Sequence, residues 1–115
     1  MNVVTIGVQS LDGVKARLGE AMRGKAPGRG VRIDFATPEL LWRVLAPKRL
    51  EILRAMSGSG PLALREIARR VGRDVKGTHT DVHALLLAGV LDRVPNGFMF
   101  PFDAIHVDFV LKAAA

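Results

Sequence analysis

The stretch LREIARRVGRDVKGTHTDVHALLLAGVL, residues 64–91, constrains the fold more than any other part of the sequence. Its first apolar residues recur at helical spacing, namely Leu64, Ile67, Ala68 and Val71. Gly72 suits the left-handed position that ends a helix, and Asp74 is predicted to cap a second helix. The inner stripe of that second helix is predicted to comprise Val75, Thr78, Val82, Leu85 and Leu86. Two helices joined by so tight a turn brace each other, so the second presents one face rigidly.

The residues before this pair predict two strands, three helices and a loop. Residues 2–8 and 31–35 are rich in β-branched residues and favour strands. Between them, an amphipathic helix is predicted to begin at Ser10, and a flexible basic loop is predicted at 24–30. Thr37 and Pro38 are typical of a helix start, and a further helix is predicted over 46–56. Trp42 is expected in the core, because lone tryptophans are usually buried anchors.

The residues after the pair predict a hairpin and a last strand. Two short apolar runs flank Asn96-Gly97, which is a strong hairpin signal. From Ala104, apolar residues alternate with His106 and Asp108 as in a strand. The order helix, helix, tight turn, helix, hairpin is that of a winged helix-turn-helix. We therefore expect an α+β fold, with a strand–helix–strand extension over 1–36 and a winged helix-turn-helix domain with a C-terminal strand over 37–115.

Charge and composition restrict the functional class. The chain carries 17 Lys and Arg against 11 Asp and Glu, a net charge of +6. The cation excess lies before residue 91, and such a protein has an electrostatic reason to meet a polyanion, although ordinary solubilising charge is an equal alternative. No apolar run approaches the ~20 residues of a membrane span, and the N-terminus has no basic signal-peptide region. The lack of Cys fits a reducing compartment, so a cytoplasmic location is expected.

The outer face of the helix after Asp74 is the candidate binding surface. If the stripe above points inward, the outward residues are Arg73, Lys76, Gly77, Thr80, His83 and Ala84. This helix spans about 20 Å at ~1.5 Å per residue and matches a major groove ~12 Å wide. Arg73 and Lys76 suit phosphate or guanine, and Thr80 suits phosphate or a thymine methyl. Gly77 either admits a close backbone approach or is a neutral exposed glycine.

Other residues complete the predicted DNA-binding set. Thr78 belongs to it, although its hydroxyl lies in the apolar stripe and requires a partner such as the carbonyl four residues earlier. Arg69 and Arg70 end the bracing helix, where they favour the helix dipole and can touch phosphate. Arg93 on the hairpin can reach the minor groove or flanking phosphates.

Enzymatic and metal chemistry are disfavoured by the sequence. It has no Cys or Tyr, no nucleophile elbow, no P-loop and no dinucleotide fingerprint, so neither catalytic residues nor a cofactor are expected. His79 and Asp81 diverge on a helix, and His106 with Asp108 is more often a surface pair. No His or carboxylate pair has zinc spacing, so no metal site is expected.

Two stretches resemble a known family. They are FATPELLWRVLAPKRLEILRAM and PLALREIARRVGRDVKGTHTDVHALLLAGVLDRVPNGFMFPFDAIHVDF, together spanning roughly residues 35–110. They are similar to small prokaryotic winged helix-turn-helix regulators of MarR- or ArsR-like type, some of which resemble antitoxins. The resemblance implies a homodimer on double-stranded DNA. Ala63 departs from the family's Ser or Thr cap, and Thr78 and Thr80 replace a valine and an arginine.

Two functional readings follow from these features. The first is a sequence-specific DNA-binding transcriptional regulator, a repressor or an autoregulating antitoxin, that inserts the helix after Asp74 into the major groove. The alternative is a winged-helix module for protein contacts, such as an antitoxin that acts mainly by binding a toxin. Dimerisation is expected through the 1–36 extension and the last strand, because something must cover their apolar faces.

Overall fold

The computed structural model describes residues 1–9 and 31–111, so the helix predicted after Ser10 and the basic loop at 24–30 lie outside the described residues. The described elements form a compact α+β domain with four helices and several strands. In chain order they are β1 (Val3–Val8), β2 (Val31–Phe35), α2 (Pro38–Val44), α3 (Pro47–Met56), α4 (Leu64–Val71), α5 (Val75–Leu87), β3 (Asp92–Val94), β4 (Gly97–Met99) and β5 (Ala104–Asp108).

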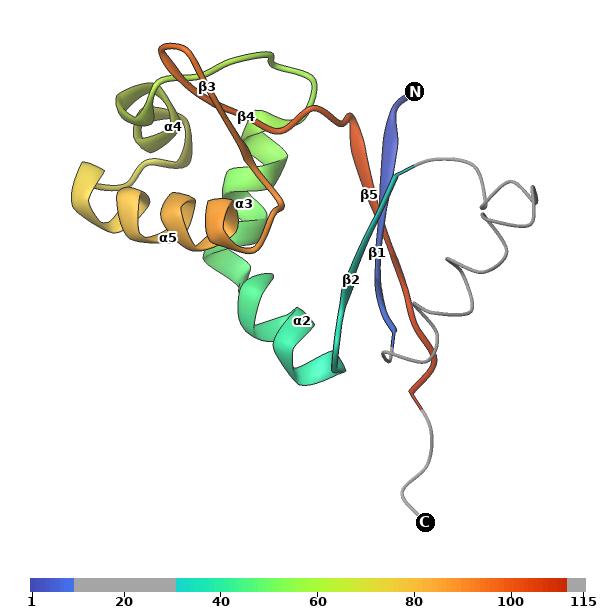
Figure 1. The fold of residues 1–115 in the computed structure, drawn as a ribbon. Coiled ribbons are helices and arrows are strands. Elements are labelled where there is room, and N and C mark those ends of the chain that lie inside the picture. The colour runs from blue at the N-terminus through green and yellow to red at the C-terminus, as the bar shows by residue number, and fades with distance from the viewer. Residues whose placement is uncertain (10–30, 112–115) are drawn as a thin grey trace.

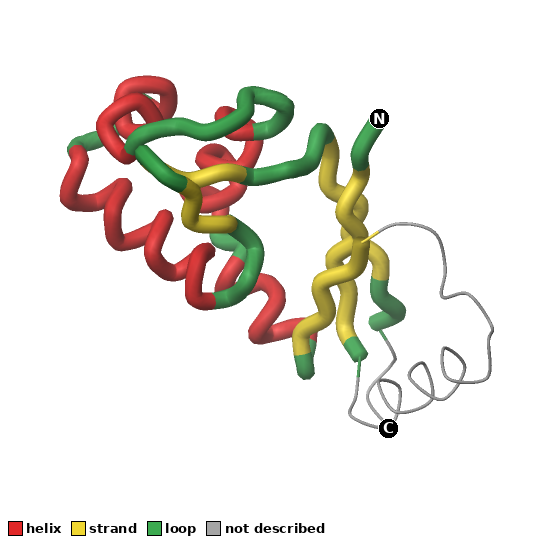
Figure 2. The backbone as a smooth tube through the Cα atoms, turned by 45° about the horizontal axis from the view of Figure 1, so that its top comes forward, coloured by secondary structure: helices red, strands yellow, loops and turns green. Residues whose placement is uncertain are grey.

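A three-stranded parallel sheet with the order β2-β1-β5 joins the two ends of the described chain. The register places Ile6 between Ile33 and Val107, and Gly7 between Asp34 and Asp108. Val4 and Ile6 on the central strand are fully buried. Figures 1 and 2 show the four described helices on one side of this sheet. The strands predicted at 2–8, 31–35 and from Ala104 are confirmed. The parallel pairing of β1 with both β2 and β5 was not predicted.

Helix α2 connects the sheet to the other helices. Thr37 caps it as predicted, because its hydroxyl accepts a hydrogen bond of 3.1 Å from the Leu40 amide, and Pro38 occupies the first turn. Leu41 and Leu45 are buried in the core, and α2 packs against β1 and β2. The prediction for Trp42 is wrong: its side chain is 50% exposed and meets Phe109 edge to face at 6.1 Å. Leu41 and Leu45 face the core, and Trp42, one residue after Leu41, points about 100° away from them around the helix and so toward the edge of the core.

Helices α3, α4 and α5 share the main core. Ile52, Leu53 and Met56 of α3 are fully buried, together with Ile67 of α4 and Leu85 of α5. Gly72 ends α4 in the predicted left-handed conformation, with φ of 68°. Asp74 begins α5 as predicted, since its carboxylate accepts a hydrogen bond of 3.3 Å from the Gly77 amide.

A short antiparallel hairpin follows α5, as Asn96-Gly97 predicts. Strands β3 and β4 pair Asp92 with Met99 and Val94 with Gly97. Two backbone hydrogen bonds of 2.8 Å join Phe98 to Leu62 in the loop before α4. The hairpin is therefore fixed to the helical unit rather than left free. No helix in the described ranges is long and apolar enough to cross a membrane.

Candidate functional site

Helix α5 is held against α3 and the preceding turn by one carboxylate. Asp81 accepts a 3.0 Å hydrogen bond from Arg49 of α3 and a 2.6 Å hydrogen bond from Arg73 of the α4–α5 turn. Burial raises the pKa of Asp81, but the hydrogen bonds from Arg73 and Arg49 outweigh it, and the pKa is lowered from its usual value. This three-residue bridge fixes the orientation of α5 relative to α3.

The inner side of α5 follows the prediction in its middle and departs from it at its start. Thr78, Val82 and Leu85 are fully buried and Leu86 is half-buried, as expected. Val75 was assigned to this stripe, but it is 43% exposed because it lies in the first turn, beyond the end of the packed core. The buried side therefore begins at Thr78.

The position of Thr78 differs from what the predicted set of DNA-binding residues requires. Its side chain is fully buried, so it cannot reach a ligand outside the protein, and the assignment of Thr78 to the DNA-binding residues is wrong. The expected bond to the carbonyl four residues earlier is also not formed, since Thr78 Oγ1 has no hydrogen-bond partner among the described residues. Thr80 makes that type of bond instead, donating to the Lys76 carbonyl at 3.3 Å.

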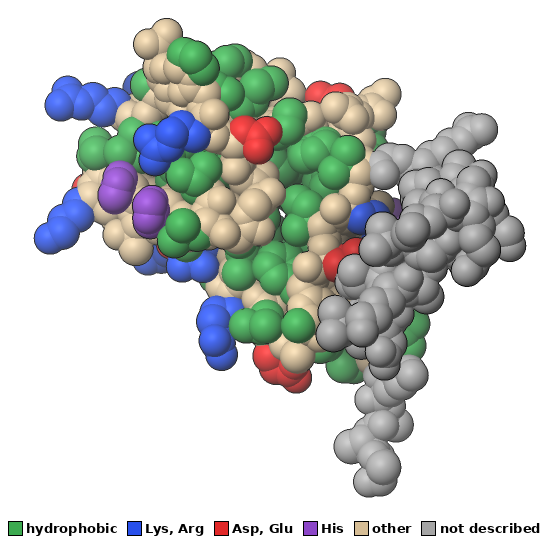
Figure 3. Space-filling model, in the orientation of Figure 1, with side chains coloured by type: hydrophobic (Ala, Val, Ile, Leu, Met, Phe, Trp, Pro, Cys, Tyr) green, Lys and Arg blue, Asp and Glu red, His purple; other side chains and the backbone are tan. Residues whose placement is uncertain are grey.

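The outer side of α5 carries four exposed polar side chains at helical spacing, Lys76, His79, Thr80 and His83. The rings of His79 and His83 stack in nearly parallel planes, with their centroids 5.8 Å apart. Figure 3 shows the two purple rings side by side over α5, with Lys and Arg side chains around them. The outward orientation predicted for Lys76, Thr80 and His83 is confirmed, whereas Gly77 and Ala84 are half-buried.

Arg73 does not belong to this exposed group. It was predicted as an outward cation, but its side chain is mostly buried and bonded to Asp81. Arg73 also explains Gly77: a Cβ at position 77 would lie 3.0 Å from the Arg73 Nη2 atom and 2.8 Å from the Asp74 cap oxygen. The lack of a side chain at Gly77 therefore accommodates the cap and the bridge.

The two arginines that end α4 are tied to the same carboxylate. Glu66 accepts hydrogen bonds from Arg69 and from Arg70, the latter at 3.0 Å. Hydrogen bonds from Arg69 and Arg70 lower the pKa of Glu66 to about 2. Arg70 also donates to the Ala55 carbonyl at 3.4 Å. The single carboxylate therefore offsets one of the two positive charges, and both guanidinium groups are already hydrogen-bonded.

The hairpin adds one cation next to the helical unit. Arg93 of β3 is exposed, as predicted, and its guanidinium lies 5.3 Å from the centroid of the Phe98 ring on β4. This cation–π contact restricts the arginine without neutralising its charge.

Sequence reasoning missed two residues that position the surface. Asp81 was considered only as a catalytic partner of His79, and Arg49 was not considered. A signal was available, because Asp81 lies directly beside the buried stripe, where an acidic residue requires a cationic partner. His79 and His83 lie four residues apart on one face of α5, which is a zinc-ligand spacing, so the statement that no His pair has such spacing is wrong. No group of three His, Cys, Asp or Glu residues in the described part of the chain is arranged to hold a metal ion.

These features define a compact α+β domain whose α5 presents an exposed polar face beside a short hairpin. Residues 44–107, which are more than half of the chain and include α3, α4, α5 and the hairpin, match the HVO_A0114 family. The chain therefore belongs to the HVO_A0114 family. No curated protein and no solved structure matches the chain.

Proposed function

We propose that this protein is a DNA-binding transcriptional regulator with a winged helix-turn-helix arrangement. Helices α4 and α5 form the helix-turn-helix pair, the β3–β4 hairpin is the wing, and α5 is the helix that enters the major groove. Its 13 residues extend over about 20 Å at ~1.5 Å per residue. Repressor and autoregulating antitoxin are both within this proposal, and the resemblance to MarR- or ArsR-like regulators agrees with it.

The observation that carries the proposal is the division of α5 into two faces. Thr78, Val82 and Leu85 are fully buried, while Lys76, His79, Thr80 and His83 are exposed. The bridge from Asp81 to Arg49 and Arg73 holds that exposed face in one orientation. Polar donors on a fixed helix face are what contact with phosphates and base edges requires.

The structure changes the residues to which we assign DNA contacts. Lys76, Thr80 and His83 remain, His79 joins them, and Arg93 is assigned to flanking phosphate or the minor groove. Arg69 and Arg70 are secondary, because a phosphate must compete with Glu66 for them. Arg73 becomes a positioning residue that acts through Asp81. We propose no catalytic role, because the exposed face holds no nucleophile activated by a base.

The test is a fluorescence-anisotropy titration with a duplex from the protein's own upstream region, repeated over a salt series. Affinity should fall steeply as salt rises, and Lys76→Ala should reduce the magnitude of the logarithmic slope by about 1. Arg43→Ala is the matched control, because it removes one exposed positive charge from α2. Equal slopes for both variants, or no binding above that of a random duplex, would contradict the proposal.

One observation favours a second function, a protein-interaction module such as an antitoxin that binds a toxin. Val75 and Leu87, at opposite ends of α5, are exposed by 43% and 77%. Exposed apolar side chains on the presented helix suit a protein partner. A salt-independent interaction with a protein, lost on Leu87→Asp and unaffected by Lys76→Ala, would favour this function over DNA binding.

A further inference from the structure

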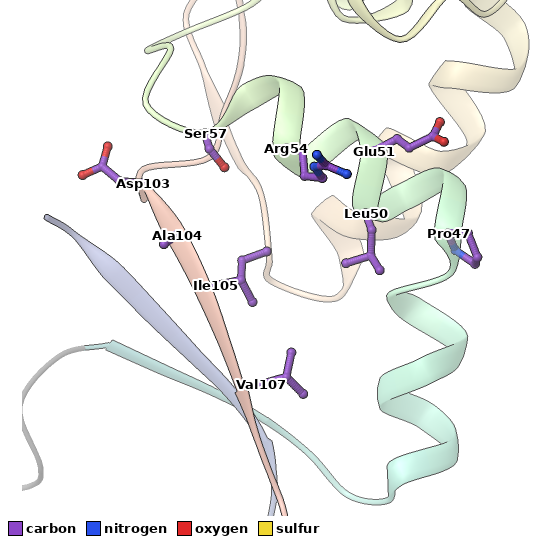
Figure 4. A pocket seen from close by; sticks show the side chains of 9 residues that line it. All are labelled: Pro47, Leu50, Glu51, Arg54, Ser57, Asp103, Ala104, Ile105 and Val107. Atoms are coloured by element: carbon purple, nitrogen blue, oxygen red, sulfur yellow. The ribbon is translucent and has the colours of Figure 1, made fainter.

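An apolar groove of about 520 Å³ runs between α3 and β5, on a different part of the protein from the exposed face of α5. Figure 4 shows Leu50 of α3 and Ile105 and Val107 of β5 pointing into it. Its rim carries the charged side chains of Glu51, Arg54 and Asp103 and the hydroxyl of Ser57. The groove opens beside β5, which is an edge strand of the parallel sheet.

Exposed apolar side chains gather along this edge. Val107 is 38% exposed in the strand, and Val110 and Leu111, directly after it, are 79% and 80% exposed. Trp42 of α2, which is half-exposed and contacts Phe109 just after β5, adds to the same apolar surface. Among the described residues, the side of β5 away from β1 pairs with no other strand. An edge strand with apolar neighbours is a template for another strand.

We propose that β5 pairs antiparallel with β5 of a second copy of this chain, across a two-fold axis at Val107, and that this pairing closes the groove. The two sheets then form one continuous sheet of six strands. Ile105 of each copy lies opposite Phe109 of the other on the groove side, a β-branched and aromatic pair of the kind that stabilises antiparallel strands. The partner's side chains cover the groove in both copies at once.

Charge and side-chain alternation favour this register over the neighbouring ones. Along β5, Ile105 and Val107 lie on the groove side of the sheet and His106 and Asp108 on the opposite side. Sliding one strand by an odd number of residues along the other would place a groove-side residue opposite a residue of the polar side. Among the remaining registers, one with its axis at His106 places histidine opposite histidine, and one at Asp108 places carboxylate opposite carboxylate. The axis at Val107 places His106 of each copy opposite Asp108 of the other, where an imidazole N–H can donate to a carboxylate.

The second copy is favoured over a foreign strand because this edge complements itself. The strand carries both His106 and Asp108, and the rim carries both Glu51 and Arg54. The axis at Val107 sets His106 of each copy against Asp108 of the other, and the mixed charge of the rim means that no like-charged surface meets itself. The proposal does not rest on DNA binding, because the oligomeric state is measured without DNA.

The cysteine-free full chain permits a direct test. Light scattering of the unmodified chain at micromolar concentration should give the mass of a dimer. Val107→Cys should form an intermolecular disulfide under mild oxidation, because directly opposite residues have Cα atoms ~4.5–5.5 Å apart, within disulfide range. Leu87→Cys, exposed on α5, is the control for random collision, and cross-linking should be at least roughly tenfold faster at position 107.

The register is tested by two further variants. His106→Cys and Asp108→Cys should each cross-link slowly alone, because their copies are diagonal neighbours ~7–8 Å apart. A mixture of the two chains should cross-link rapidly, because position 106 faces position 108. A monomeric unmodified chain, or a dimer in which Val107→Cys cross-links no faster than Leu87→Cys, would overturn the proposal.

Discussion

The bridge between Arg49, Asp81 and Arg73 gives the most specific stability prediction. Asp81→Asn keeps the shape of the side chain and one oxygen acceptor but removes the charge. Both hydrogen bonds to Asp81 then become weaker, and the two guanidinium groups lose the anion between them. Because the bridge joins α3 to α5, we expect the loss to lower the global stability of the domain.

The size of the loss follows from the two bonds and their exposure. Hydrogen bonds to charged groups contribute ~1.5–3 kcal/mol and neutral ones ~0.5–1.5 kcal/mol. Losing the charge in two bonds therefore costs about 2 kcal/mol. The three side chains are between 15% and 21% exposed, so solvent screens only part of this interaction. With a urea m-value of ~1.5 kcal/mol/M, the unfolding midpoint should fall by about 1 M.

The effect should depend on pH with a definite sign. The pKa of Asp81 is lower in the folded protein than its unfolded value of ~3.9, so the folded state favours the charged form. The stabilisation is complete above the unfolded pKa and is lost as the pH falls through the folded pKa. The difference between Asp81→Asn and the unmodified protein should therefore be constant between about pH 5 and 7 and shrink below about pH 4.

Urea unfolding followed by far-ultraviolet circular dichroism at several pH values measures both expectations. Glu66→Gln is the matched control, since it removes one carboxylate that binds two arginines on the surface of α4. Its midpoint should move much less, because solvent already screens that cluster. A midpoint shift for Asp81→Asn no larger than that of Glu66→Gln, or one unchanged down to pH 3, would refute the reasoning.

Three other substitutions test local features, each by thermal or urea unfolding. Thr78→Val should stabilise the domain by about 1 kcal/mol, because it removes a buried hydroxyl that has no partner in the described structure, while the exposed Thr80→Val should change little. Ala63→Ser should add about 1 kcal/mol by capping α4, and no gain would contradict the assigned helix start. Gly72→Ala should cost ~1–2 kcal/mol through its positive φ alone, since nothing lies within 4 Å of the added Cβ.

The local elements could be predicted because their signals are local. Thr37, Asp74 and Gly72 each mark a helix boundary through their own side chain or its absence, and the structure confirms all three. Asn96-Gly97 fixes the hairpin in the same way, with Asn96 at a φ of 73°. Such residues act within one turn of backbone, so no knowledge of the tertiary fold is needed.

Pairing partners and side-chain environments could not be predicted in the same way. Alternation in residues 104–108 predicts a strand but does not indicate that β1, about a hundred residues earlier, is its neighbour. Trp42 was assigned by the average behaviour of tryptophan, but its position on α2 places it outside the buried stripe. Arg73 was assigned by helical spacing alone, and its environment is set by Asp81 and by Arg49 on another helix.

The path of the chain through the sheet has a consequence for the rigidity of the helical unit. The chain enters that unit from β2 and leaves it into β5, and these strands flank the same central strand. Phe35, which ends β2, is aligned with Val8 of β1, and Ala104, which begins β5, is aligned with Val3. The two attachment points therefore lie at opposite ends of the sheet, about 19 Å apart at ~3.3 Å per residue and ~4.8 Å per strand. Asn2 also bonds to Asp103 and to the Pro101 carbonyl at the start of β5. The helical unit is thus attached to the same sheet at both of its ends, and under the proposed function little orientational entropy is lost when α5 binds DNA.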